Sequence, residues 1–201
     1  MIPDMGNTVT ELADRALADR HEALTAEIRA LLDAALVVMQ RADTIDPKVT
    51  DIVRESGLSN QAFYRHFDGK DALLLALLAD GRDRLARTIE RRMARAASPD
   101  ERVRAWVGAV LDQARDPDAA AATRPFVANS ERLAVEYPIE VARSRDQLLE
   151  PLTAAVGATD AHAVYHVAMG AVHDALAARH TPSKREIEAL TEFAIRGCRH
   201  D

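Results

Sequence analysis

The sequence has few of the residues that several classes of protein depend on. It contains one cysteine, Cys198, in 201 residues, so no disulfide can form within a single chain and no thiolate metal cluster can be assembled. No stretch approaches the roughly 20 consecutive apolar residues of a membrane span. The first 20 residues also lack the basic start and the apolar run of a secretory signal. These absences predict a cytoplasmic protein without a membrane segment.

Positive charge is also scarce. The chain carries 26 lysines and arginines against 32 aspartates and glutamates, a net charge of −6, which argues against diffuse binding to nucleic acid through a generally basic surface. Residues 41–70 hold five basic and five acidic side chains, so this segment is neutral. Any contact with DNA must therefore be local.

The common signatures of catalysis are missing as well. The sequence has no Gly-rich phosphate loop, no G-x-S-x-G nucleophile elbow and no H-E-x-x-H metal motif. We therefore expect a protein that is not an enzyme and that needs no cofactor for a reaction.

The spacing of apolar residues predicts an all-α fold of about nine helices. Apolar residues recur at three- and four-residue steps nearly throughout, and no alternating stretch bounded by turn residues indicates a strand. We expect an N-terminal extension over residues 1–20, a first helical domain over 21–70 and a second over 71–201. A long helix from about residue 69 to 97 would connect the two domains. The alanine-rich residues 116–122 are expected to form a loop or a short turn, whereas Pro125 and Pro138 are expected to begin helices.

Residues 51–73 have the pattern of a helix-turn-helix. Ile52 on the first short helix and the aromatic pair Phe63 and Phe67 on the second, four residues apart, would form a miniature core. Gly57 permits the left-handed backbone of the turn between them.

The face of the second short helix opposite this core is suited to reading bases. At 100° per residue from Phe63, Gln61 and Arg65 project away from the buried side. In the major groove a glutamine can bond adenine and an arginine can bond guanine, in each case with two hydrogen bonds. Lys48 and Ser59 lie at helix starts, which attract phosphate, and the phenol of Tyr64 and the ammonium group of Lys70 can also reach phosphates. Such contacts set the register of the protein on the DNA. The predicted DNA-binding residues are Lys48, Ser59, Asn60, Gln61, Tyr64, Arg65 and Lys70.

Residues 28–78 resemble the DNA-binding domain of the TetR (tetracycline-repressor-like) family of bacterial regulators. The matching residues are Ile52, Gly57, Leu58, Ser59, Tyr64, Phe67 and Lys70. The sequence departs from the family pattern at Asp43, where glycine is usual, and at Lys48, where a threonine often touches phosphate. Asn60 and Gln61 replace the commoner lysine and glycine, so no operator sequence carries over.

The resemblance implies a repressor that binds a palindromic operator as a homodimer. It further implies that the second domain binds a small-molecule effector, that the last two helices form the dimer interface, and that effector binding releases the DNA. Double-stranded operator DNA, a second copy of the chain and the effector are the expected partners, and the identity of the effector stays open.

Two other groups of residues leave alternatives open. Trp106, Phe126 and Met169 are candidates for lining a ligand cavity, although packing in a core explains each of them equally well. His162 and His166 lie one helical turn apart, a spacing that can bind zinc or nickel, although histidines on an exposed helix face are ordinary. The alternative function is therefore a metal sensor, or a ligand-binding protein on the same scaffold without DNA binding.

Overall fold

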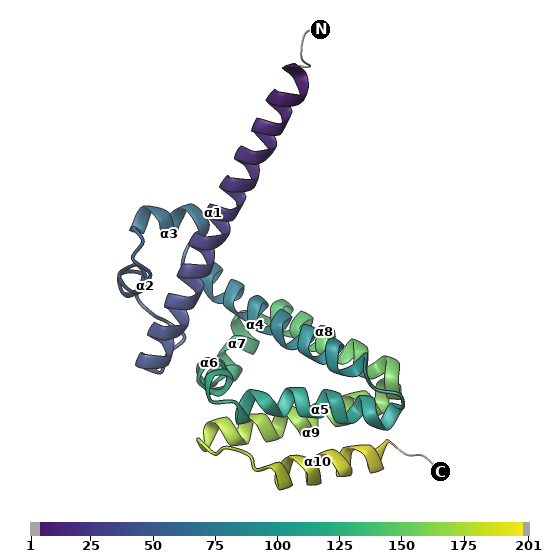
Figure 1. Ribbon diagram of the computed structural model, residues 1–201. Coiled ribbons are helices and arrows are strands. Elements are labelled where there is room, and N and C mark those ends of the chain that lie inside the picture. The colour runs from purple at the N-terminus through teal and green to yellow at the C-terminus, as the bar shows by residue number, and fades with distance from the viewer. Residues whose placement is uncertain (1–4, 199–201) are drawn as a thin grey trace. The chain divides into compact units, whose positions relative to one another are not determined.

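Helices form all the regular secondary structure of the residues that the computed structural model describes, which are 5–198 for the backbone and 9–198 for the side chains (Figure 1). The all-α prediction is confirmed. The helices are α1 (Met5–Ala42), α2 (Val49–Ser56), α3 (Asn60–His66), α4 (Lys70–Met93), α5 (Pro99–Arg115), α6 (Pro117–Ala128), α7 (Ser130–Glu136), α8 (Pro138–Val156), α9 (Ala158–Ala177) and α10 (Lys184–Gly197). Within this part of the chain, none of these helices combines the length and the apolar character needed to cross a membrane.

The chain divides into two compact units. The first unit comprises the residues up to Ala42 together with Asp46–Leu73, and so contains α1, α2, α3 and the first residues of α4. The second unit comprises Asp43–Ile45 and the residues from Leu74 onward, and so contains the rest of α4 and α5 to α10.

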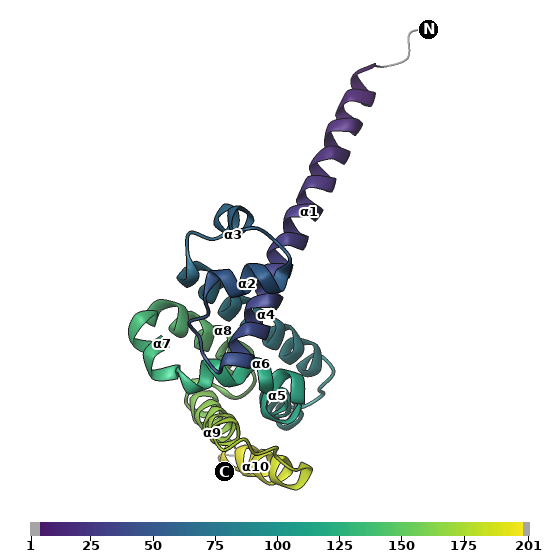
Figure 2. The same ribbon diagram turned by 90° about the vertical axis from the view of Figure 1, so that its left-hand side faces the viewer.

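The helix α1 is unusually long because the N-terminal extension continues directly into the first helix of the domain. Its C-terminal part is buried, with Leu31, Ala35 and Met39 completely inaccessible to solvent. Its N-terminal part projects beyond α2 and α3 in both views (Figures 1 and 2), and Val9 and Leu12 there are 65% and 59% exposed. Only the second half of α1 therefore contributes to the core of the first unit.

The core of the first unit joins α1 to the two short helices. Ile52 of α2 and Phe63 of α3 have no exposed surface, like Leu31 of α1. The rings of Phe63 and Phe67 lie 5.7 Å apart between centroids. The predicted miniature core is thus confirmed, and it fixes α3 with one face toward α1 and α2.

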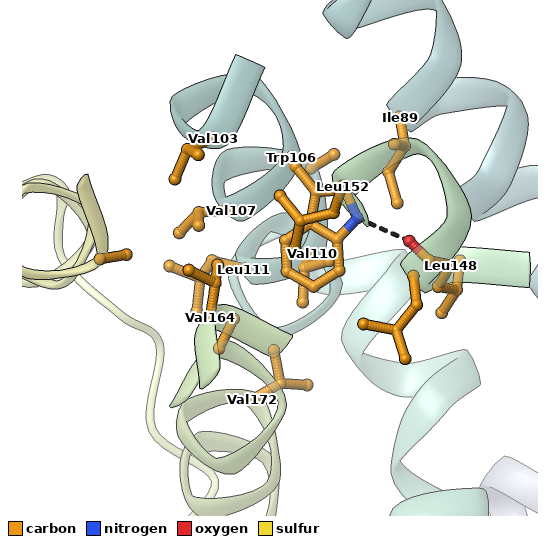
Figure 3. Close-up of a cluster of buried hydrophobic side chains, with 14 of the residues drawn as sticks. Ile89, Val103, Trp106, Val107, Val110, Leu111, Leu148, Leu152, Val164 and Val172 are labelled. Carbon is orange, nitrogen blue, oxygen red and sulfur yellow. Dashed lines mark hydrogen bonds between the residues drawn. The ribbon is translucent and has the colours of Figure 1, made fainter. Parts of the chain in front are cut away.

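The core of the second unit is larger and centres on α5 (Figure 3). Trp106 is completely buried, and its indole N–H donates a hydrogen bond of 2.9 Å to the backbone carbonyl of Leu148 in α8. Around it pack the apolar residues Ile89, Val103, Val107, Val110, Leu111, Leu152, Val164 and Val172. Burial of these side chains joins α4, α5, α8 and α9 into one body.

Two local predictions for the second unit are wrong. Residues 117–128 form the helix α6 rather than a loop, which brings the number of helices in residues 5–198 to ten. Asp116 caps the helix by accepting hydrogen bonds from the backbone N–H groups of residues 118 and 119, and Pro117 occupies the first turn, where its missing N–H costs nothing. Pro125 lies inside α6 instead of beginning a helix, whereas Pro138 begins α8 as expected.

Candidate nucleic-acid interface

The turn between α2 and α3 has the backbone conformation that its sequence favours. Gly57 follows α2 with φ 71° and ψ 10°, in the left-handed region that favours glycine. Ser59 then caps α3, because its hydroxyl oxygen accepts a hydrogen bond of 3.1 Å from the backbone N–H of Ala62. A turn of three residues therefore joins two short helices, as in a helix-turn-helix.

The helix α3 has one buried and one exposed face. Ala62 and Phe63 are 6% and 0% exposed and face the core of the first unit. Gln61 and Arg65 are exposed and lie one helical turn apart, so both side chains belong to the same outer surface. Tyr64, on the flank, is 60% exposed, and the edge of its ring contacts Phe63 at 5.2 Å between centroids.

All seven predicted DNA-binding residues are exposed and belong to the first unit. Asn60, Gln61, Tyr64 and Arg65 lie on α3 itself. The other three lie at helix starts: Lys48 precedes α2, Ser59 precedes α3 and Lys70 begins α4. The DNA-binding role of each residue stays a prediction, but none of the seven is buried in the core.

Arg65 makes a contact that the sequence analysis missed. Its Nη2 atom donates a hydrogen bond to Oε2 of Glu27 on α1. The Nε2 atom of His66 donates to the same oxygen at 2.7 Å. These two hydrogen bonds lower the pKa of Glu27 below its usual value, and the bond from His66 has the larger effect. Because Glu27 and Arg65 are 38 residues apart in the sequence, no local pattern could have revealed the pair.

Four basic residues of the first unit form ion pairs with acidic ones. The ion pairs are Arg41 with Glu55 at 3.2 Å, Arg54 with Asp51 at 2.8 Å, Arg65 with Glu27, and Lys70 with Asp46. Three of these pairs lie within residues 41–70, whereas Arg65 pairs with an acid outside that segment. Phosphates that approach Lys70 or Arg65 must compete with a carboxylate that is already bound there.

The three candidate ligand residues lie in the second unit but in different surroundings. Trp106 is a core residue with a satisfied indole, and Met169 is partly buried against the same core. Phe126 is partly buried on α6. A groove of about 390 Å³ in this unit is lined by other residues, which include Leu111, Ala175, Ile187 and the hydrogen-bonded side chains of His180 and Glu186. A role in ligand binding stays a prediction for all three candidates.

The candidate metal ligands His162 and His166 are both exposed on α9. The Nδ1 atom of His162 lies 2.8 Å from the backbone oxygen of Ala158, and the ring of His166 packs edge-on against Tyr165. Among the described residues, no group of three or more histidine, cysteine or acidic side chains is placed to hold a metal ion. The metal role remains an untested alternative.

Comparison with known sequences points to one family for the first unit. Residues 31–77 match the sequence model of the family described as "Bacterial regulatory proteins, tetR family". The HTH-type transcriptional regulator BetI of Brucella canis is 32% identical over 79 residues, which are 39% of this chain and 40% of BetI. The chain thus matches less than half of the length of this relative.

Comparison with solved structures extends over both units. The regulator SCO7518 of Streptomyces coelicolor matches with a TM-score of 0.69 and 17% identity, over 85% of this chain and 96% of its own. The transcriptional regulator FadR of Bacillus subtilis, solved in complex with stearoyl-CoA, matches with a TM-score of 0.61 and 15% identity, over 85% and 96%. At these identities the likeness concerns the fold alone.

Proposed function

We propose that the chain is a transcriptional regulator of the tetR family, whose sequence model matches residues 31–77, and that it binds DNA through α3. The observation that supports this function best is the division of α3 into a buried face with Phe63 and an exposed face with Gln61 and Arg65. A helix with this division can enter the major groove while its other side stays attached to the domain. The proposed place of action is the cytoplasm.

The residues of the exposed surface would act in two ways. Gln61 and Arg65 would read base edges, each with two hydrogen bonds, and so determine which sequence is bound. Lys48, Tyr64 and Lys70 would contact the sugar-phosphate backbone, which sets the register without reading sequence. Binding by Lys70 would require partial release of Asp46, its partner in the free protein.

The proposed active form is a homodimer that pairs through α9 and α10. Both helices carry exposed residues that suit such an interface: Phe193 of α10 is 60% exposed, and Gly170 of α9 is exposed and would let another helix approach closely. A two-fold dimer would present two copies of α3 to a palindrome. Its half-sites would be about 34–36 Å apart, or a multiple of that distance.

A small molecule bound in the second unit would release the DNA. Such an effector must have a higher affinity for the dimer conformation that cannot bind DNA than for the conformation that can. A tenfold preference corresponds to about 1.4 kcal/mol per dimer. FadR binds a fatty acyl thioester, so acyl compounds are one effector class to screen, beside drug-like compounds and metabolites.

The experiment that tests this function is selection of random double-stranded DNA on the purified full-length protein. Enrichment of a palindrome that a dimer binds would support the regulator and would supply the operator for effector screens. If folded dimeric protein enriches no sequence at low salt, α3 does not read DNA and the proposed function is wrong.

A further inference from the structure

One carboxylate oxygen on α1 holds two consecutive residues of α3. Oε2 of Glu27 accepts a hydrogen bond from Nη2 of Arg65 and another, of 2.7 Å, from Nε2 of His66. The two donors differ in exposure, since the His66 side chain is 6% exposed and the Arg65 side chain 50%. Glu27 therefore connects a buried ring with one terminal nitrogen of a half-exposed guanidinium.

Glu27 is itself fixed by this arrangement. His66 is almost buried, so its ring has a defined position in the first unit, and its N–H group points at the carboxylate. The hydrogen bond from His66 is also the main reason that the pKa of Glu27 is lowered below its ordinary value. The bond from His66 therefore gives the Glu27 carboxylate an anchor that does not involve Arg65.

The bond to Glu27 leaves Arg65 able to read a base. A guanidinium has five N–H donors in a planar fork, and Glu27 accepts from Nη2 only. Guanine presents two acceptors in the major groove, O6 and N7, which need two of the remaining donors. A long side chain that is already held in one orientation also loses less conformational freedom when it binds.

We propose that Glu27 is a specificity-positioning residue, which holds the Arg65 guanidinium against α1 so that its outer donors point at one base pair of each half-site. This inference rests on the proposed function, because it assigns a role within DNA reading by α3. Glu27 would not touch the DNA. It would act through Arg65, and its loss would change discrimination at the Arg65 position more than affinity for DNA in general.

The test compares Glu27→Gln with Glu55→Gln in the full-length protein. Both substitutions remove one negative charge next to an arginine, but Glu55 on α2 pairs with Arg41, which lies outside α3. Affinity is measured for the selected operator and for operators altered at single base pairs. Arg65→Ala identifies the base pair that Arg65 reads, as the position where discrimination falls by roughly tenfold to a hundredfold.

Glu27→Gln should reduce discrimination at that base pair by about three- to tenfold and leave discrimination at the other positions unchanged. Glu55→Gln should leave discrimination at every position unchanged. When Arg65→Ala is already present, adding Glu27→Gln should have no further effect, because the group that Glu27 positions is gone. Thermal unfolding of each variant checks that the first unit is folded. Glu27→Ala, which removes the acceptor altogether, should repeat the result with a larger loss.

Two results would overturn the inference. If Glu27→Gln changes discrimination no more than Glu55→Gln, the pair has no part in reading the base. If Glu27→Gln sharpens discrimination at the Arg65 position, Glu27 competes with DNA for the guanidinium instead of positioning it. Failure of the proposed function looks different, because the wild-type protein would then prefer no operator and Arg65→Ala would change nothing.

Discussion

The two units of the chain use their helices in different ways. In the first unit, α3 buries Ala62, Phe63 and the side chain of His66 and leaves its other four side chains exposed. In the second unit, α5 is buried along most of its length around Trp106. A helix that must enter a DNA groove can give only one narrow face to its own core, whereas a helix inside a bundle has no such restriction. The attachment of α3 to its unit therefore depends on a few buried side chains, whereas α5 is held by many.

Charge is distributed differently as well. The cations of the first unit that lie near α3 are paired with acids, such as Lys70 with Asp46 and Arg65 with Glu27. In the proposed function, these pairs would lower the attraction of the free protein for arbitrary DNA. Specificity would then depend on the few side chains that project from α3.

The largest expected effect comes from removing the aromatic anchor of the first unit. Phe63→Ala deletes a completely buried ring and should destabilise that unit by about 3–5 kcal/mol. Because the core of the second unit does not include Phe63, amide exchange should increase in α1 to α3 while exchange in α5 and α9 stays slow. Equal loss of protection in both units would show that they unfold as one body.

The corresponding substitution in the second unit should have a smaller effect. Trp106→Phe keeps an aromatic ring but loses the indole N–H that bonds Leu148, at a cost of about 1–3 kcal/mol. Denaturant unfolding should detect this loss in the second unit, with affinity of the first unit for DNA unchanged. A stability equal to the wild type would mean that the hydrogen bond and the ring shape contribute nothing.

A third substitution tests whether the cap of α3 matters to the smaller unit. Ser59→Ala removes the hydroxyl that accepts the bond from Ala62 and should cost about 1 kcal/mol. Ser59→Gly, which is tolerated at an N-cap, is the matched control and should cost only a few tenths of a kcal/mol. Thermal unfolding of the first unit measures both. Equal melting temperatures for the alanine variant and the wild type would contradict the role of the cap.

The smallest expected effect concerns acid stability of the second unit. The hydrogen bonds from Ser183, through its side chain and its backbone, and from His180 lower the pKa of Glu186 to about 2. The stability from this group is present above pH 4.5, its ordinary value, and is lost as the pH falls toward about 2. Glu186→Gln should therefore flatten the fall in stability between pH 4.5 and 2. An unchanged acid profile in the variant would exclude this contribution.

The features that the sequence predicts well are those encoded within a few residues. Gly57 and the Phe63–Phe67 spacing each act within one turn of helix, and the structure bears them out. Asp116 and Pro117 carry an equally local signal for the start of a helix. The segment forms a helix instead of the predicted loop or short turn because a proline is tolerated in the first turn of a helix.

The features that the sequence does not reveal join distant residues. The contact of Arg65 with Glu27 spans 38 positions, and the bond from Trp106 to Leu148 spans 42. Both depend on how helices pack, which the periodicity of one helix does not specify. For the same reason the sequence offers Trp106, Phe126 and Met169 as ligand residues without indicating what surrounds them.

The most direct test of DNA reading by α3 is the base-pair preference of Gln61→Ala and Arg65→Ala on the selected operator. Each variant should lose about 1–3 kcal/mol of discrimination at one base-pair position per half-site. Lys70→Ala, in contrast, should weaken binding to all sequences alike and flatten its salt dependence. If Gln61→Ala and Arg65→Ala keep the affinity and the sequence preference of the wild type, the exposed face of α3 does not read DNA.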